Sequence, residues 1–266
     1  MKHYNTVLTI AGSDSGGGAG IQADIKSISA TGGYAASAIT AVTVQNTMGV
    51  RSIFPVDIAT ITGQVDAVLS DIGAKAVKIG MLHSEEVVLA VADVLKRHAV
   101  TNIVLDPVMV STSGHRLIEE SAIQALTRML IPMARVITPN IPEAEILCGR
   151  SIVGQNDFPE VARSLSMDGR VSVLLKAGHL NGNYLTDVFY NAESDTILEM
   201  KSKRLDTRNT HGTGCTLSSA LASYLAQGLP LDDAVKSAKD YISRAIAAGA
   251  EYEIGNGHGP VNHFFL

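Results

Sequence analysis

The sequence is poor in several residue types, and each shortage narrows the class of protein. Its 266 residues include two cysteines, no tryptophan and only 5% aromatic residues. Two cysteines cannot form the disulfide framework of a small secreted domain, so the chain fits a reducing compartment. Acidic residues outnumber basic ones, and the formal net charge of −5 excludes the basic footprint typical of nucleic-acid-binding domains.

Long apolar runs are also missing. The first one, Val7 to Ala11, is too short for the core of a signal peptide. Nowhere do roughly 18 apolar residues follow one another, as a membrane-spanning helix requires. We therefore expect a cytoplasmic protein that does not bind membranes. The hydrophobic fraction of 46% still provides a large core, which excludes a disordered chain.

Short apolar runs alternate with helical patterns along most of the chain. Such alternation is typical of βαβ units, which form a parallel sheet with helices on both faces. We predict one α/β domain over residues 1–266, because an eight-fold barrel fits the late hairpin and the paired last helices poorly. The predicted strands are Thr6–Ala11, Ser37–Val44, Ala76–Ile79, Ile103–Leu105, Val136–Thr138 and Val171–Leu175, followed by a hairpin over Tyr184–Leu205. The predicted helices are Ala19–Ala30, Ile58–Asp71, Ser84–His98, Glu119–Met129, Pro142–Cys148, Asp157–Met167, Gly214–Gln227 and Leu231–Ala248.

A glycine-rich segment, Ala11–Asp24, links the first strand to the first helix. Glycines there let the backbone approach a ligand, and the helix N-terminus offers unpaired N–H groups. The segment has no lysine, so it is not a P-loop, and its glycines do not match the dinucleotide-binding pattern. It is either a ligand-binding loop or a tight turn between strand and helix.

A second glycine-containing turn, Thr210–Thr216, opens a helix of small residues. Gly212, Thr213 and Gly214 bring successive N–H groups together, as an anion hole for a transferring phosphoryl group requires. Cys215 falls in the first helical turn, where the helix dipole is expected to lower the pKa of its thiol. The thiol is then a candidate base or nucleophile. The alternative is a small residue packed beneath a turn.

Polar residues also follow three later strands. Asp106, Asn140 and Glu143 lie at the carboxyl ends of strands, where α/β sheets bind ligands, and such oxygen atoms suit Mg²⁺. Lys176 ends the Val171–Leu175 strand and either contacts phosphate or extends to solvent. Glu143 can alternatively serve only as a helix cap. The cysteines and histidines match no zinc-binding spacing.

In their order along the chain, these motifs resemble the signature of the ribokinase superfamily. Within it, the chain is similar to the hydroxymethylpyrimidine and phosphomethylpyrimidine kinases of thiamin biosynthesis. The segments that carry the resemblance are Ala11–Asp24, Gln45-Asn46-Thr47, Asp106–Gly114, Thr210–Thr216 and Gly257–Phe264. The resemblance implies a three-layer sandwich, a homodimer, and the use of ATP with Mg²⁺. The implied reaction phosphorylates 4-amino-5-hydroxymethyl-2-methylpyrimidine and then its monophosphate.

The resemblance also assigns residues. Those implied for the pyrimidine pocket are Gly12, Asp24, Thr43, Gln45, Met81 and Val108. Those implied for Mg²⁺ and the nucleotide are Asp106 and Glu143, with Asn140, Lys176 and Thr210. Those implied for catalysis are Lys176, Gly212, Thr213, Gly214 and Cys215, and Cys215 stands where most of the superfamily has an aspartate base.

Two further hypotheses and two rivals remain open at this point. The backbone amides of Gly16–Gly20 are expected to hold the phosphate of the second acceptor. Val110–Arg116 is either a lid or an ordinary surface loop. The nearest rival function is a pyridoxal or pyridoxine kinase of the same superfamily. A rival of another class is a nucleotide-binding regulator that has lost catalysis.

Overall fold

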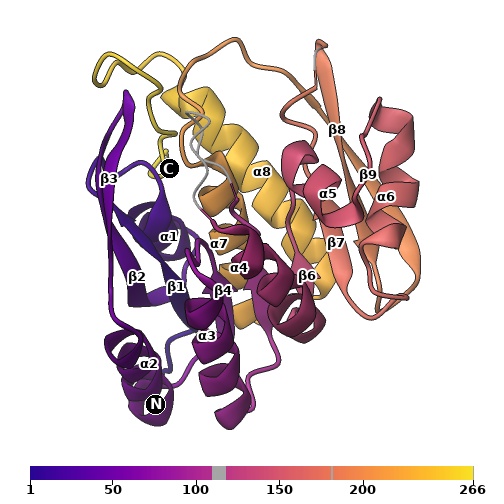
Figure 1. Ribbon diagram of the computed structural model, residues 1–266. Coiled ribbons are helices and arrows are strands. Elements are labelled where there is room, and N and C mark those ends of the chain that lie inside the picture. Colours follow the sequence, from indigo (N-terminus) through magenta and orange to yellow (C-terminus); the bar gives the residue numbers. More distant parts are fainter. Residues whose placement is uncertain (110–117, 181, 266) are drawn as a thin grey trace.

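The computed structural model describes residues 1–109, 118–180 and 182–265, and these residues form one nine-stranded sheet (Figure 1). The strand order is β3-β2-β1-β4-β5-β6-β7-β8-β9. The six strands from β2 to β7 in this order are parallel, while β3, β8 and β9 are antiparallel to their neighbours. The strands are β1 (Thr6–Asp14), β2 (Tyr34–Asn46), β3 (Gly49–Pro55), β4 (Ala76–Ile79), β5 (Ile103–Leu105), β6 (Val136–Ile137), β7 (Ser172–Leu175), β8 (Tyr184–Asn191) and β9 (Thr196–Lys203).

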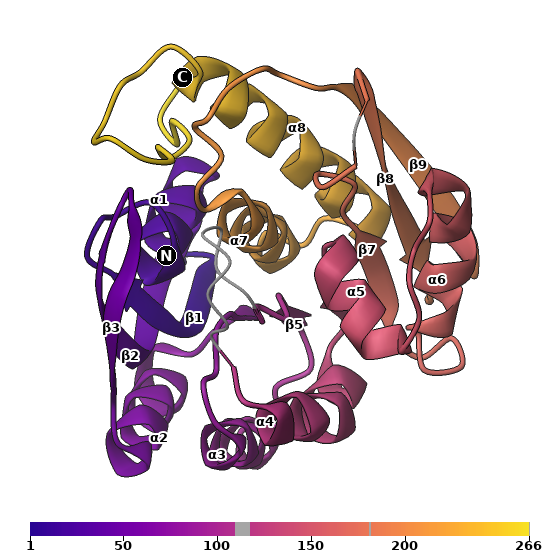
Figure 2. The same cartoon turned by 45° about the horizontal axis from the view of Figure 1, so that its top comes forward.

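Helices cover both faces of the sheet, as the alternation of strands and helices predicts (Figure 2). Each face has its own apolar core, one of them formed with α1, α7 and α8 and the other with the remaining helices. This arrangement confirms the predicted three-layer α/β fold. The helices are α1 (Gly20–Ala30), α2 (Ile58–Ala67), α3 (Glu85–Arg97), α4 (Glu120–Ala125), α5 (Ile141–Cys148), α6 (Phe158–Ser164), α7 (Thr213–Ala226) and α8 (Leu231–Gly249).

Several predicted boundaries were wrong. β3 was not predicted at all, because its side chains lack an apolar alternation and Pro55 ends it. It pairs only with β2 and forms one edge of the sheet, where a strand buries little. The helix predicted over Glu119–Met129 is α4 followed by a π-helical turn, Leu126–Leu130. Ile58–Asp71 also ends in a π-helical turn, which periodicity does not distinguish from α-helix.

The parallel strands bring their carboxyl ends to one edge of the sheet, next to the first turn of α7. The C-terminal segment crosses this same region after α8. There the N–H group of His258 donates to the carbonyl of Thr47, and His211 pairs with Pro260 as an isolated bridge. Within the described residues, no helix combines the length and apolar character needed to cross a membrane.

Candidate active site

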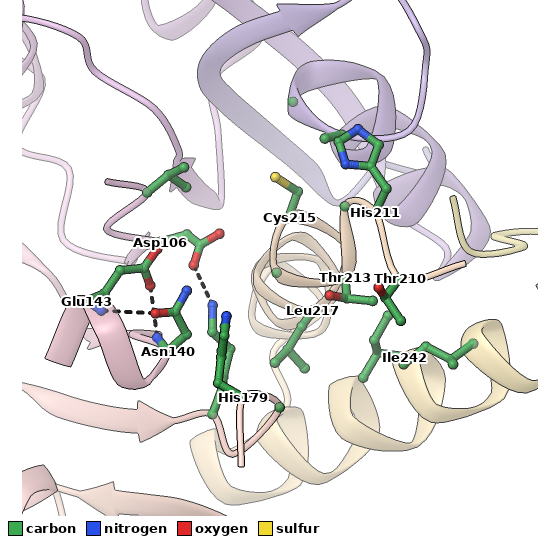
Figure 3. Close-up of a pocket in the computed structure, with 18 of the residues that line it drawn as sticks. Asp106, Asn140, Glu143, His179, Thr210, His211, Thr213, Cys215, Leu217 and Ile242 are labelled. Atoms are coloured by element: carbon green, nitrogen blue, oxygen red, sulfur yellow. Dashed lines mark hydrogen bonds and ion pairs between the residues drawn. The ribbon is translucent and has the colours of Figure 1, made fainter. Parts of the chain in front are cut away.

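A cavity of about 740 Å³ lies at the carboxyl edge of the sheet, in front of α7 (Figure 3). Residues from both glycine-containing turns, the strand ends and α8 line it. All the site residues predicted from the sequence line this cavity except Asp24. They are Gly12, Thr43, Gln45, Met81, Asp106, Val108, Asn140, Glu143, Lys176, Thr210, Gly212, Thr213, Gly214 and Cys215.

The two glycine-containing turns, almost 200 residues apart in the sequence, pack directly against each other. Gly212 has a φ of +78°, and a side chain there would overlap the carbonyl oxygen of Gly18. A Cβ at Gly18 would in turn lie 2.5 Å from the ring of His211. Glycine is therefore required at Gly212 by the close approach of two backbones, and at Gly18 by the packing of the His211 ring.

Most of the amides that the hypothesis for Gly16–Gly20 offers to a phosphate are already paired within the first turn. The carboxylate of Asp14 already accepts hydrogen bonds from the N–H groups of Gly16 (2.8 Å), Gly18 (3.0 Å) and Ala19 (2.8 Å). The N–H group of Gly17 donates to the Asp14 carbonyl. An internal anion thus occupies the N–H groups of Gly16 and Gly18, which weighs against a phosphate site there, whereas the Gly20 backbone faces the Cys215 thiol.

The start of α7 is the remaining anion-binding position. Gly212 precedes the helix in the left-handed conformation, and Gly214 and Cys215 lie in its first turn, where N–H groups lack helical partners. A Cβ on Gly214 would lie 3.3 Å from Lys176 Nζ and 3.5 Å from Asp106 Oδ2. The helix N-terminus, the lysine and the aspartate therefore surround one small volume that suits a phosphoryl group.

Cys215 is half-buried in the cavity wall. Desolvation there, with the nearby carboxylates of Asp24 and Asp106, raises the pKa of the thiol to about 11. The Lys78 ammonium group and a hydrogen bond from the Gly20 backbone oppose this shift. The expectation that the helix dipole lowers this pKa is wrong for the ligand-free protein, because desolvation of the thiolate outweighs it.

Asp106 and Lys176 form a buried ion pair on the other side of the α7 start. Lys176 Nζ and the Thr138 hydroxyl both donate to Asp106 Oδ1 at 2.9 Å. Burial alone would raise the pKa of Asp106, but the ammonium groups of Lys176 and Lys78 lower it. Asp106 is therefore ionised, and Lys176 does not extend into solvent.

Asn140 and Glu143 are both a helix cap and part of the cavity wall. The Asn140 side chain accepts from the Glu143 N–H group, and Glu143 accepts from the Asn140 N–H group, so both form a capping box for α5. Burial raises the pKa of Glu143 to about 7, although Lys176 opposes the shift. A divalent cation beside Glu143 would offset this cost of burying its charge.

The donor set fits Mg²⁺ that is bound together with a nucleotide. Mg²⁺ commonly takes one or two carboxylates and completes its octahedron with waters and phosphate oxygens. Asp106 and Glu143 supply such carboxylates in the cavity. No cluster of three or more His, Cys, Asp or Glu side chains among the described residues is able to hold a metal ion. A bound nucleotide and water would supply the remaining ligands, as is usual for Mg²⁺.

Asp24 does not line the cavity, which corrects its assignment to the pyrimidine pocket. Its side chain is fully buried and forms an ion pair with Lys78 Nζ at 2.9 Å. The hydroxyl groups of Thr9 (2.6 Å) and Ser219 (2.7 Å) also donate to it. These partners saturate the carboxylate beneath the first turns of α1 and α7, so it supports the site from behind.

The sequence analysis missed several residues of the cavity. His211 and Asp14 fall within the two glycine-containing segments, but the sequence analysis gave neither a role of its own. Asp187 and Lys239 line the cavity as a buried ion pair at 2.7 Å. The signal for Asp14 was its place two residues before Gly16. The segments of β8 and α8 carry no pattern that pairs Asp187 with Lys239. The predicted lid, Val110–Arg116, lies outside the described residues.

Solved structures place this fold and site in a known class. The chain superposes on an ADP complex of pyridoxal kinase from Bacillus subtilis with a TM-score of 0.89 and 35% identity, over 98% of this chain and 97% of the other. It superposes on phosphomethylpyrimidine kinase from Clostridium difficile with a TM-score of 0.79 and 44% identity, over 91% and 99%. The fold and the site therefore define a small-molecule kinase of the ribokinase-like class.

Sequence comparison places the chain more narrowly. The family model described as phosphomethylpyrimidine kinase matches residues 14–262. A hydroxymethylpyrimidine/phosphomethylpyrimidine kinase from Rhizobium meliloti is 50% identical over 97% of this chain and 96% of its own length. The chain belongs to the phosphomethylpyrimidine kinase family.

Proposed function

We propose that this protein transfers the γ-phosphoryl group of ATP to 4-amino-5-hydroxymethyl-2-methylpyrimidine, and then phosphorylates the monophosphate to the pyrophosphate, in thiamin biosynthesis. The observation that carries the proposal is a single cavity that joins Gln45 to the start of α7 and to the Asp106–Lys176 pair. An acceptor ring and a phosphate chain fit the two ends of such a cavity. Family membership supports the same reaction.

Each part of the cavity then has a role in phosphoryl transfer. The N–H groups of Gly214 and Cys215 and the Lys176 ammonium group stabilise the charge on the transferring phosphoryl group. Asp106 and Glu143 would hold Mg²⁺, which neutralises phosphate charge when it is bound. Thr210 and Asn140 also line the cavity, and we assign them to nucleotide binding.

Cys215 is the proposed acceptor of the hydroxyl proton. Only its thiolate form can accept this proton, and at a pKa of about 11 that form is a small fraction at neutral pH. In a loose transition state the acceptor oxygen has formed little of its bond to phosphorus, so the hydroxyl proton leaves late. Phosphoryl transfer therefore depends more on positioning than on a strong base. We therefore expect slow turnover.

A pyridoxal kinase is the second candidate. The TM-score of 0.89 to the pyridoxal kinase from Bacillus subtilis favours it, because the two backbones share one architecture. Gln45 favours the pyrimidine, since its amide offers a donor beside an acceptor to an aminopyrimidine edge. A non-catalytic regulator is the weakest candidate, because Asp106, Glu143 and Lys176 keep the arrangement that phosphoryl transfer needs.

The homodimer and the cytoplasmic location stay predictions. A measurement of the molecular mass in solution tests the homodimer.

A coupled assay of ADP release with MgATP tests the proposal. Hydroxymethylpyrimidine, its monophosphate and pyridoxal are offered separately to the wild type and to a Lys176→Met variant. We expect turnover of both pyrimidines, slower turnover of pyridoxal, and none of these activities in the variant. Turnover of pyridoxal alone would assign the chain to the second candidate. Binding of ATP without turnover of any acceptor would favour the regulator.

A further inference from the structure

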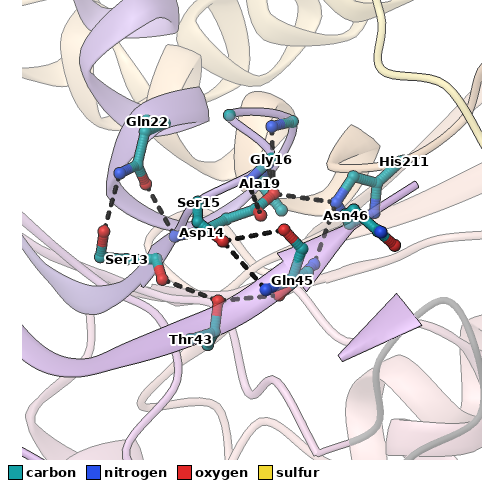
Figure 4. Close-up of polar contacts among 12 residues, drawn as sticks. Ser13, Asp14, Ser15, Gly16, Ala19, Gln22, Thr43, Gln45, Asn46 and His211 are labelled. Atoms are coloured by element: carbon teal, nitrogen blue, oxygen red, sulfur yellow. Dashed lines mark hydrogen bonds and ion pairs between the residues drawn. The ribbon is translucent and has the colours of Figure 1, made fainter. Parts of the chain in front are cut away.

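Four polar side chains form a hydrogen-bonded row at the end of the cavity where the pyrimidine is proposed to bind (Figure 4). They are those of Asp14, His211, Gln45 and Thr43. His211 Nε2 lies 3.0 Å from Asp14 Oδ2 and 3.2 Å from Gln45 Nε2. Gln45 Oε1 lies 3.1 Å from Thr43 Oγ1, which lies 2.9 Å from the carbonyl oxygen of Ser13. The Gln45 amide is therefore held between a histidine and a threonine.

The histidine end of this row of side chains favours an acceptor from Gln45. Asp14 is 3% exposed and its pKa is lowered: burial opposes this shift, but hydrogen bonds from His211 and from the Ala19 and Gly16 amides outweigh it. An ionised carboxylate only accepts, so His211 Nε2 carries the hydrogen that faces Asp14. The protonated ring nitrogen has no lone pair for an amide N–H group at 3.2 Å, whereas an amide oxygen there can share the single Nε2 hydrogen with Asp14 as its second acceptor.

The threonine end requires a donor from Gln45. The Thr43 hydroxyl has one hydrogen and two acceptors in reach, and it donates to the nearer one, the Ser13 carbonyl oxygen at 2.9 Å, rather than to Gln45 Oε1 at 3.1 Å. The hydroxyl oxygen can then accept a hydrogen bond from an amide nitrogen but has no hydrogen left for an amide oxygen. Both ends therefore favour the same orientation, with Nε2 toward Thr43 and Oε1 toward His211. A half-turn of the amide about its last bond produces it without moving another atom.

We propose that His211, held by Asp14, and Thr43, held by Ser13, are positioning residues that fix the direction of the Gln45 amide and thereby select the acceptor. The fixed amide presents a donor on its Thr43 side and an acceptor on its His211 side. A 4-aminopyrimidine edge has a ring nitrogen that accepts beside an amino group that donates. The amino group therefore faces the His211 side, and the ring nitrogen faces the Thr43 side.

The inference rests on the proposed function and predicts discrimination against one specific analogue. Replacing the 4-amino group by an oxo group reverses the order of donor and acceptor along this edge of the pyrimidine, because the ring nitrogen then carries a hydrogen and the oxygen accepts. A locked amide meets this analogue donor to donor and acceptor to acceptor. A site built around such hydrogen bonds rejects the mismatched ligand strongly, because buried polar groups stay unpaired.

The experiment compares the dissociation constants of the amino and oxo pyrimidines by isothermal titration calorimetry without ATP. It uses the wild type, His211→Phe and Thr43→Val, which act on the two ends of the amide independently. His98→Phe is the matched control, because His98 pairs with Asp66 on the opposite side of the sheet from α7. We expect the preference for the amino compound to fall at least about tenfold in each of the first two variants, the effect of about 1.4 kcal/mol. The control keeps the wild-type preference.

The outcomes separate this inference from the proposed function. A preference that stays at the wild-type value in both variants, or equal weakening of both ligands, overturns the inference and leaves the kinase assignment standing. Failure of the wild type to bind the amino compound overturns both. Because only a freed amide can turn to accept the oxo compound, tighter binding of that analogue by His211→Phe or Thr43→Val supports the lock directly.

Discussion

At the scale of single residues, the site depends on charges that are buried in pairs. Lys176 with Asp106 faces the cavity, whereas Lys78 with Asp24 lies behind it. Cys215 lies between the two pairs and responds to the charges of both. Each charged group is held by a partner, because an isolated buried charge costs several kcal/mol.

We predict that Cys215 reacts slowly with iodoacetamide at neutral pH and progressively faster toward pH 10. Only the thiolate reacts, and with a pKa of about 11 its fraction rises about tenfold per pH unit in this range. Alkylation is followed by mass spectrometry in a Cys148→Ser background, so that one thiol remains.

We also predict that Cys215→Ala lowers kcat strongly. A loss of less than about threefold would show that the thiol is not the base.

We predict that Lys78→Met destabilises the fold more than the double variant Asp24→Asn with Lys78→Met. The single change leaves a buried carboxylate without its cation, at a cost of roughly 3–5 kcal/mol. In the double variant an amide oxygen still accepts from Thr9 and Ser219, and no charge remains. Urea denaturation gives the free energies of unfolding. Equal stability of both variants would mean that Asp24 does not need the Lys78 charge.

At the scale of elements, two glycine-containing turns form one unit through the Gly18–Gly212 contact. The first turn is organised from inside by Asp14, and the second opens α7. His211 connects them, because its ring packs against Gly18 and hydrogen bonds to Asp14. A change in the first turn is therefore transmitted to the anion hole.

We predict that Gly18→Val lowers kcat/KM for hydroxymethylpyrimidine and for its monophosphate to a similar extent. The new side chain displaces His211, which both reactions require, and it does not remove a phosphate site specific to the second. The two reactions are measured separately by ADP release. Gly154→Val is the control, since a Cβ there meets nothing within 4 Å. A loss confined to the monophosphate would restore the first-turn amides as its phosphate site.

At the scale of the whole molecule, the C-terminal segment ties the two halves of the site together. His263 is 4% exposed, and its Nε2 lies 3.0 Å from the hydroxyl of Thr216, the residue after Cys215. The Tyr241 hydroxyl donates to the His263 carbonyl. Gly257 and His258 bind Thr47, close to Gln45. The end of β2, which carries Gln45, and the start of α7 are therefore both held by the C-terminal segment.

We predict that this contact makes stability fall as the pH drops from 6.5 to 4. Burial lowers the pKa of His263 to about 4, so the unfolded state binds a proton in this range and the folded state does not. The stabilisation is present above pH 6.5 and decreases by about 3 kcal/mol on acidification to pH 4. Urea midpoints at pH 7 and 4.5 measure the slope. His263→Gln cannot titrate and should show a smaller one; an unchanged slope would contradict this.

The sequence by itself determined the fold class, the family and most of the cavity wall. Buried parallel strands and glycine turns depend on local residue type, and Asp106, Asn140 and Lys176 follow strand ends that must meet at one edge of the sheet. Ordered motifs such as Thr210–Thr216 needed no coordinates to indicate phosphoryl transfer. Edge strand β3 escaped prediction because an exposed strand has little apolar pattern.

Only the tertiary structure decided what each polar group faces. Asp24 and Asp14 are both carboxylates beside the same turn, yet one neutralises Lys78 and the other accepts from the turn's own amides. The protonation of Cys215 depends on burial and on charges from distant segments. Hydrogen-bond partners and desolvation arise from contacts between residues far apart in the chain, which local sequence does not encode.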